Sequence, residues 1–301
     1  MRIVIALGGN ALIRRGGRTD MAEQQRNIAH ATSVIAGIAR GNQVVVTHGN
    51  GPQIGLLALL DASAPDAQRS TLDVLGAETD GMIGYLLERE LMNALGHPLV
   101  ATLLTQVEVD PADPAFENPT KFIGPVYTEA EARRIAAARG WQIAPDGVHW
   151  RRVVPSPEPL RILECEAIEH LVHAGFVTIC TGGGGVPVTR TADKKLIGVE
   201  CVVDKDRSSA LLAESMRADT LLMLTDVDYV YRNWGEENPE PIRKISPYEL
   251  RSRSFAAGSM GPKVEAARRF ARTPGARAYI GSLDRVAEIL AGTSGTLVTA
   301  D

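Results

Sequence analysis

The sequence predicts an α/β protein: a three-layer αβα sandwich around a central, mainly parallel, open sheet, with a small lid subdomain protruding from it. Strand-like apolar runs alternate with helix-like segments through most of the 301 residues, a pattern typical of a parallel sheet with helices on both faces. Three of the apolar runs end directly in a glycine-rich turn. The composition changes between residues 110 and 159, which marks an insertion in an otherwise regular single domain over residues 1–301.

The first part of the chain contains six expected elements. A helix that begins near residue 21 has Ile28, Ile35 and Ile38 close to one face. A later helix ends before Gly96, a common signal for a helix end. The expected strands cover residues 3–7, 43–47 and 99–105, and the expected helices cover residues 21–40, 53–62 and 72–95.

The insertion contains much of the proline and two of the three tryptophans. We expect it to hold a short basic helix over residues 129–139, with strand-like flanks at residues 107–109 and 151–154. After the insertion the alternation of strands and helices resumes. The later helices are expected over residues 167–174, 206–217, 260–272 and 283–290, and the later strands over residues 176–180, 220–224, 278–280 and 296–299.

Composition and charge exclude several classes of partner. A formal net charge of −4 gives no general attraction to nucleic acid or to a membrane surface, so any anion binding must be local. No apolar run approaches the roughly 20 residues of a membrane span, and no signal-peptide pattern precedes the first strand. Cys165, Cys180 and Cys201 lack a paired spacing and are expected to be buried free thiols. We therefore expect a cytoplasmic protein.

Three glycine-rich turns follow apolar runs and indicate an anion site. Because the carboxyl ends of parallel strands meet at one edge of a sheet, backbone amides and asparagine side chains there can surround a small oxyanion. Neither the dinucleotide fingerprint nor the P-loop spacing is present. Any one turn is compatible with an ordinary tight turn, but three together favour phosphate binding. The turns contain Gly8, Gly9 and Asn10; Gly49, Asn50 and Gly51; and residues 181–187.

Three lysines stand in settings that suit an anionic ligand. Lys205 lies between Asp204 and Asp206 at a change from strand to helix, which suits a cation oriented by a carboxylate; a charged surface is the alternative. Lys263 falls in the first turn of an expected helix, where the helix dipole disfavours a cation unless an anion binds nearby; a solvated lysine is the alternative. Lys121 is held between prolines at the mouth of the insertion, as suits a lid residue.

Several other polar residues have ordinary structural interpretations. His48 either serves the function of its loop or makes a structural hydrogen bond. Glu78 and Asp80 are expected on the polar face of a long helix. The arginines of the insertion show no stacked aromatic pattern for nucleic acid and are expected to be solvated: Arg133, Arg134, Arg151 and Arg152.

In combination and in order, these motifs resemble the carbamate kinase branch of the amino-acid kinase family over nearly the full chain. The segments over residues 118–125 and 153–157 are peculiar to that branch. Ala6 stands where many other family members have a lysine, which argues against acetylglutamate kinase and aspartokinase; in the branch pattern Lys121 supplies the missing charge. The matching segments are residues 6–11, 48–53, 104–107, 109–113, 118–125, 153–157, 182–187, 204–206, 225–230 and 258–263.

The resemblance implies reversible phosphoryl transfer between carbamoyl phosphate and ADP, giving ATP and carbamate. It also implies a homodimer, and magnesium held by the nucleotide phosphates and water without a direct protein ligand. About residues 1–200 would form the carbamate half and about residues 201–301 the nucleotide half, with the lid over about residues 110–159.

The same resemblance assigns roles to individual residues. The catalytic residues would be Lys121, Lys205, Asp206 and Lys263, with Asp206 orienting the lysines. The substrate would be bound by Gly8, Gly9, Asn10, Gly49, Asn50 and Gly51. The nucleotide would be bound by Lys205, Asp226, Asp228, Tyr229, Met260 and Lys263. Plain strand-end turns explain Asp226 and Asp228 equally well.

Two further functions stay open from the sequence. One is a related kinase that phosphorylates another small carboxylate or carbamate-like acceptor. The other is a catalytically silent ligand sensor on the same fold, against which the presence of all three lysines weighs. The direction of the reaction in the cell, and whether arginine, purine or another catabolic route feeds it, are also open.

Overall fold

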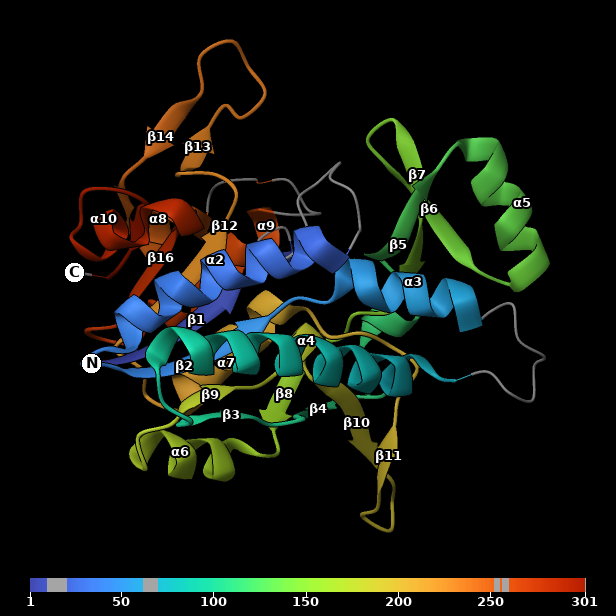
Figure 1. Ribbon diagram of the computed structural model, residues 1–301. Coiled ribbons are helices and arrows are strands. Elements are labelled where there is room, and N and C mark those ends of the chain that lie inside the picture. Colours follow the sequence, from blue (N-terminus) through green and yellow to red (C-terminus); the bar gives the residue numbers. More distant parts are fainter. Residues whose placement is uncertain (10–20, 62–69, 252–254, 256–259, 301) are drawn as a thin grey trace.

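The computed structural model describes residues 1–9, 21–61, 70–251, 255 and 260–300, and it has the expected three layers (Figure 1). The central sheet has eight strands in the order β15-β17-β16-β12-β1-β2-β9-β3. Of its neighbouring pairs only β16 and β17 are antiparallel, which confirms the mainly parallel open sheet. The strands are β1 (Arg2–Leu7), β2 (Gln43–His48), β3 (Val100–Thr102), β9 (Val177–Ile179), β12 (Thr220–Thr225), β15 (Lys244–Ile245), β16 (Arg277–Ser282) and β17 (Thr296–Val298).

Helices cover both faces of this sheet and enclose two separate cores. Successive side chains of a strand point to opposite faces, so Val4 and Ala6 of β1 enter one core while Ile3, Ile5 and Leu7 enter the other. The first core lies under α6 (Cys165–His173), α7 (Lys205–Ser215), α8 (Pro247–Arg251) and α9 (Met260–Phe270), and the second lies under α2 (Met21–Ala39), α4 (Leu72–Leu95) and α10 (Val286–Leu290).

A second sheet corrects two sequence predictions. The strand expected over residues 99–105 is only β3, and the chain then enters β4 (Gln106–Val109), which belongs to a four-stranded sheet of order β11-β10-β4-β8. The turn expected over residues 181–187 is shorter, because β10 already begins at Val186. The sequence prediction missed β8 (Pro159–Ile162), β10 (Val186–Arg190) and β11 (Leu196–Gly198).

Most of the insertion forms a small unit that stands apart from the central sheet (Figure 1). Its three antiparallel strands are β5 (Lys121–Tyr127), β7 (His149–Val154) and β6 (Gln142–Asp146), and they pair in that order. The expected helix over residues 129–139 is α5 (Glu129–Arg139). It begins with a capping box of Thr128 and Glu131 and ends at Gly140, whose φ is 66°.

Two arginines of this unit are packed rather than solvated, contrary to the sequence prediction. The guanidinium of Arg152 lies over the ring of Trp141, with its Cζ 4.6 Å from the ring centroid, and burial lowers the pKa of Arg152. Arg151 donates to the carbonyl oxygen of Gly124 and pairs with Asp146. These contacts hold the side chains of Arg151 and Arg152 against the three-stranded sheet.

The last third of the chain departs from the prediction in small ways. The helix expected over residues 283–290 is a 3₁₀ turn (Leu283–Arg285) followed by α10. The hairpin of β13 (Val230–Arg232) and β14 (Glu240–Ile242) was not predicted. Its strands are three residues long, too short to show a period-2 pattern. In the described part of the chain, no helix is both long and apolar enough to cross a membrane.

The insertion contacts the body of the protein through a crossing of two glycines. A Cβ on Gly55, in α3 (Gly51–Asp61), would lie 2.0 Å from both Cα and N of Gly124 in β5. Neither side can yield easily, because both atoms that would clash belong to the backbone. Gly124 also has a φ of +75°, which favours glycine. The close approach therefore needs glycine at position 55, and the backbone conformation favours glycine at position 124.

We expect Gly55→Ala to lower the free energy of unfolding by about 1–3 kcal/mol, because α3 and β5 must separate. Gly37→Ala is the matched control: Gly37 is exposed in α2, and a Cβ there would meet nothing within 4 Å. That change should stabilise the protein by about 0.5–1 kcal/mol. Denaturant unfolding of both variants checks the difference, and equal stability of the two would contradict the close crossing.

Candidate active site

Two of the glycine turns meet at the carboxyl end of the central strands. Gly8 directly follows β1, and its N–H donates to the carbonyl oxygen of Leu224 in β12 at 3.0 Å. Gly49 directly follows β2, and its N–H donates to the carbonyl oxygen of Leu7 at 3.1 Å. A Cβ on Gly49 would lie 3.2 Å from N of Gly9. The parallel strands thus bring the turns together as expected, whereas Asn10 lies outside the described residues.

The third glycine turn packs against the second. Thr181 begins it with a φ of +48°, a strained conformation for a β-branched residue, and its N–H donates to Oγ1 of Thr105 at 3.0 Å. A Cβ on Gly183 would lie 2.1 Å from Nδ2 of Asn50, and one on Gly184 would lie 2.3 Å from the carbonyl oxygen of Val203. Only glycine leaves room for this packing.

Lys121, Lys205 and Lys263, the three lysines predicted from the sequence, lie together at the start of α7. Asp204 caps the helix: its Oδ1 accepts the N–H groups of Asp206 and Arg207, at 2.9 and 3.2 Å, while its Oδ2 pairs with Nζ of Lys121 from β5. Asp206 binds the other two lysines. Its Oδ1 lies 2.5 Å from Nζ of Lys205 and its Oδ2 lies 3.0 Å from Nζ of Lys263 in α9.

This cluster of Lys121, Lys205, Lys263, Asp204 and Asp206, called the lysine cluster below, is largely buried. Lys205 and Asp206 are 9% and 4% exposed. With every member ionised, the three ammonium groups outnumber the two carboxylates, and the cluster has an excess of one positive charge. A buried site of this kind favours an anion as its missing partner.

The pKa values within the cluster follow from burial and mutual attraction. Burial alone would raise the pKa of Asp206, but the ammonium groups of Lys205 and Lys263 outweigh it and hold that pKa below its usual range. Burial likewise opposes ionisation of Asp204, and the charge of Lys121 overcomes it, so that its pKa is lowered as well. Burial lowers the pKa of Lys205, Asp206 only partly offsets this shift, and the neighbouring charge of Lys263 lowers the pKa further. The carboxylates therefore stay ionised at neutral pH.

Hydroxyl groups of α7 connect the lysine cluster to the glycine turns. Ser208 donates to the carbonyl oxygen of Gly184 at 2.7 Å. Ser209 shares a hydrogen bond with Thr47 at the end of β2, with 2.6 Å between their oxygens. A Cβ on Gly49 would also lie 3.8 Å from Cδ of Lys205. The start of α7 is thus fixed against the second and third glycine turns. The lysines and the glycine amides therefore lie at the same end of the sheet.

A profile of the amino acid kinase family matches residues 1–282. The chain belongs to this family. The match covers seven of the eight strands of the central sheet, all but β17, together with the glycine turns and all three lysines of the cluster. It makes the protein a kinase, a phosphotransferase. The resemblance that the motifs indicated is therefore confirmed.

Known relatives of this kinase match it over their whole length. A carbamate kinase of Haemophilus influenzae is 51% identical over 300 residues, which cover 99% of this chain and 97% of the relative. Two solved structures of carbamate kinase from Giardia lamblia, bound to citric acid and to AMP-PNP, superpose with TM-scores of 0.93 and 0.89. Each is 40% identical to this kinase and covers 100% of its chain, with 98% of the solved chain matched. The amino-acid kinase fold is confirmed.

Whereas the three lysines meet in one cluster, the other residues predicted to contact nucleotide lie further apart in this kinase. Asp226 lies near the lysine cluster. Burial lowers the pKa of Lys263, but the charge and hydrogen bond of Asp206, together with the charges of Asp204 and Asp226, outweigh burial and raise this pKa. Asp228 instead pairs with Arg285 at 3.1 Å. Tyr229 is buried, with Cζ of Arg243 5.4 Å from its ring centroid. Met260, at the start of α9, packs partly buried against the first core.

Sequence reasoning missed two parts of this site. Asp204 was seen only as a neighbour of Lys205, although an aspartate just before a helix is a recognisable cap. Asp80 was assigned to a polar helix face together with Glu78, and this was wrong for Asp80, which is fully buried beside His48. Glu78 is exposed, as predicted. No local signal distinguishes the two carboxylates, because the contact joins residues far apart in the sequence.

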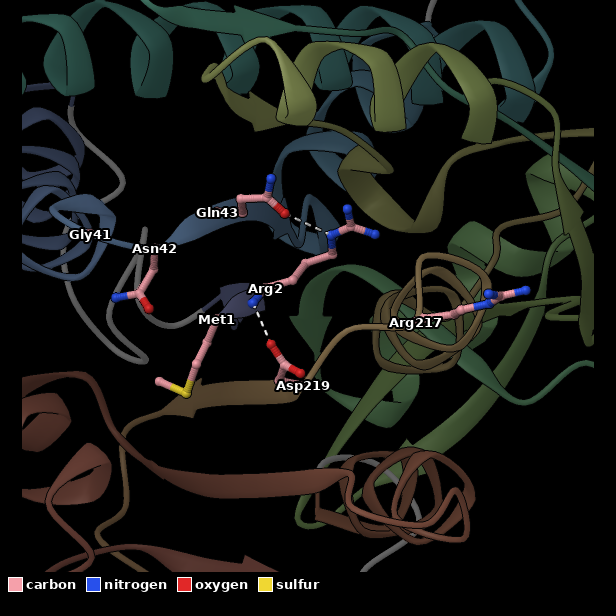
Figure 2. Close-up of a pocket in the computed structure, with 7 residues that line it drawn as sticks. All are labelled: Met1, Arg2, Gly41, Asn42, Gln43, Arg217 and Asp219. Carbon is pink, nitrogen blue, oxygen red and sulfur yellow. Dashed lines mark hydrogen bonds between the residues drawn. The ribbon is translucent and has the colours of Figure 1, made fainter.

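A cavity of about 570 Å³ lies at the other end of the sheet (Figure 2). Its lining includes Arg2 and Gln43, which begin β1 and β2, whereas the glycine turns follow the ends of these strands. The N–H of Arg2 donates to Oδ2 of Asp219 across it at 2.7 Å. This cavity is therefore separate from the candidate active site.

Proposed function

We propose that this kinase transfers a phosphoryl group reversibly between carbamoyl phosphate and ADP, giving ATP and carbamate. The observation that carries the proposal is the meeting of Lys121, Lys205 and Lys263 at the start of α7, beside the glycine turns. Phosphoryl transfer needs two aligned anions and neutralised charge on the moving oxygens. The carbamate kinases among the relatives support carbamoyl phosphate as the substrate.

The proposed reaction is a single exchange of P–O bonds. In the direction of ATP formation, a terminal oxygen of ADP forms a bond to phosphorus while the bond from phosphorus to the carbamoyl oxygen breaks. The electron pair of the broken bond leaves with carbamate. Lys205 and Lys263 would neutralise the oxygens of the moving group, and Asp206, bonded to both, would hold them in place. Lys121 would neutralise the carbamoyl phosphate side from the insertion.

The remaining contacts divide between the two substrates. Backbone amides and the asparagine side chains would bind carbamoyl phosphate on one side, through Gly8, Gly9, Asn10, Gly49, Asn50 and Gly51. The nucleotide would lie on the other side, near Lys205, Asp226, Asp228, Tyr229, Met260 and Lys263. We assign the carbamate half to about residues 1–200 and the nucleotide half to about residues 201–301, with the lid over about residues 110–159.

Magnesium would enter this site bound to the nucleotide phosphates. The phosphates and water would supply its ligands.

We also propose a homodimer in the cytoplasm, with a place in a catabolic route such as that of arginine. Exposed apolar side chains on α3 and α4 support association of two copies: Leu56, Leu60, Val74, Met82 and Tyr85.

Formation of ATP from ADP and carbamoyl phosphate, followed in a coupled assay, tests the proposed reaction. Robust turnover is expected. Turnover with another small acyl phosphate but not with carbamoyl phosphate would mean that the kinase phosphorylates a different small acceptor. Tight nucleotide binding without turnover of any acceptor would instead identify a silent sensor.

Lys121→Ala should raise KM for carbamoyl phosphate by about tenfold or more, since a charged contact to that substrate is lost. The affinity for ADP should stay nearly unchanged, because Lys205 and Lys263 remain in place. Steady-state kinetics with each substrate varied in turn measure both effects, and Lys121→Arg tests whether charge alone suffices. A selective loss of ADP binding in Lys121→Ala would contradict the place of Lys121 in the site.

A further inference from the structure

A buried pair of polar side chains lies directly beneath the glycine turns and has no part in the proposed transfer. Nε2 of His48, the last residue of β2, is 3.4 Å from Oδ1 of Asp80 in α4, and both residues are fully buried. Within the described part of the chain, neither the carboxylate oxygens of Asp80 nor Nε2 of His48 complete a hydrogen bond.

Such a pair costs stability rather than adding to it. Moving a carboxylate out of water is expensive, and a contact of 3.4 Å without further hydrogen bonds does not compensate for it. The thiol of Cys180 is also close enough to interact: burial and then the charge of Asp80 raise its pKa, so this thiol stays neutral. Unpaired buried polar groups are rare in native proteins, and functional sites are one of the places where they occur.

Two adjacent residues of α4, Thr79 and Asp80, contact the residues on either side of Gly49 in the second glycine turn. Asp80 faces His48, and Thr79 accepts a hydrogen bond from Nδ2 of Asn50 at 2.8 Å. The turn between them contains Gly49. One turn of α4 therefore fixes both sides of the glycine whose amide belongs to the proposed carbamoyl phosphate site.

The third glycine turn rests on the same pair. A Cβ on Gly182 would lie 1.8 Å from Oδ1 of Asp80 and 2.6 Å from Cε1 of His48, so the backbone of this turn lies directly against both side chains. Asp80 therefore touches the second turn through His48 and the third turn through Gly182.

We propose that Asp80, with His48 and Thr79, is a positioning residue that sets the two glycine turns at the spacing required by carbamoyl phosphate. This inference rests on the proposed function, since it names residues that shape the same site. Asp80 acts through the turns and does not itself reach the substrate.

Asp80→Asn tests the proposal, because it keeps the size of the side chain and removes its charge. We expect KM for carbamoyl phosphate to rise about tenfold while KM for ADP changes less than about twofold. Glu78→Gln is the matched control: the same chemical change, two residues away on the less buried side of α4. It should leave both constants at their wild-type values. Equal KM values for carbamoyl phosphate in the two variants would overturn the proposal.

A second measurement does not depend on activity. In the free protein, amide hydrogen exchange in residues 49–51 and 182–185 should be faster in Asp80→Asn than in Glu78→Gln, with exchange in β1 unchanged. This result would stand even if carbamoyl phosphate were not the substrate. Unchanged exchange in both turns would overturn the positioning role, whatever the substrate.

Thr79 supplies a variant pair in case Asp80→Asn does not fold. Thr79→Val removes the hydroxyl that binds Asn50 at nearly constant volume, whereas Thr79→Ser keeps it. The valine variant should raise KM for carbamoyl phosphate and the serine variant should restore it. A serine variant as impaired as the valine variant would mean that packing, not the hydrogen bond, matters, and would overturn the role given to Thr79.

Discussion

Lys205→Ala will lower turnover by on the order of a hundredfold or more, as expected when a preorganised charge at the transferring group is lost. Lys205 is buried and lies between the glycine turns and Asp206, so no solvent cation can take its place with the same geometry. The fold should survive, because Asp206 keeps Lys263 as its partner. Steady-state rates at saturating carbamoyl phosphate and ADP, together with circular dichroism, check both parts.

Lys263→Ala should behave in the same way, since it removes the other ammonium group from Asp206. A matched control comes from the exposed β10–β11 hairpin, where Lys195 pairs with Asp193 at 2.8 Å. Lys195→Ala removes the same kind of ion pair away from the site and should leave turnover unchanged. Wild-type turnover in Lys205→Ala or Lys263→Ala would mean that the lysine in question does not neutralise the moving phosphoryl group.

The sequence predicted the layers of the fold because they follow from local patterns. The apolar period of β1 separates two cores, and α5 begins and ends at the residues that its capping box and Gly140 dictate. Two features of this region were missed: β3 ends at Thr102, and β4 belongs to a second sheet. The local sequence does not mark the point where a chain leaves one sheet for another, because the partners of β4 are β10 and β8, which lie far along the chain.

In the site too, features with a local sequence pattern could be predicted, whereas contacts between distant residues could not. Glycine turns and lysines could be read from the sequence because each has a local signature: a strand end, a helix start or a flanking proline. The pairing of Asp206 with both Lys205 and Lys263 was anticipated only through the family resemblance, since 57 positions separate Asp206 from Lys263. Asp80 had no signature at all. Its burial follows from the packing of α4 against the turns, which no pattern within α4 records.

Asp206→Asn should lower the free energy of unfolding more than the loss of either lysine does, because it leaves the buried ammonium groups of Lys205 and Lys263 without the carboxylate that they share. Removing one partner of a buried charged group typically costs about 3–5 kcal/mol of the free energy of unfolding. Turnover should fall at least about a hundredfold, since neither lysine is then held in position. Asp193→Asn, on the exposed hairpin, makes the same change to a surface pair and should alter neither quantity measurably.

The pH dependence identifies the cause of the instability. In the wild type, the lysines hold the pKa of Asp206 below its usual range despite burial, so its contribution is present above about pH 4 and is lost as pH falls through the folded-state pKa. In Asp206→Asn, the buried lysines lack their counter-charge and bind protons less readily than in the unfolded chain. The stability of the variant should therefore rise with pH as these lysines deprotonate.

The gap in stability between wild type and Asp206→Asn should therefore be widest near neutral pH and should narrow in both directions. Below about pH 4 it narrows because the unfolded wild-type chain begins to protonate Asp206, whereas the folded protein still keeps it ionised. In alkaline solution it narrows because the variant no longer keeps two like charges in its interior. Urea unfolding of both proteins across this range measures the gap. A constant gap would mean that the substituted amide merely packs worse than the native carboxylate, and that Asp206 does not hold the charges of Lys205 and Lys263.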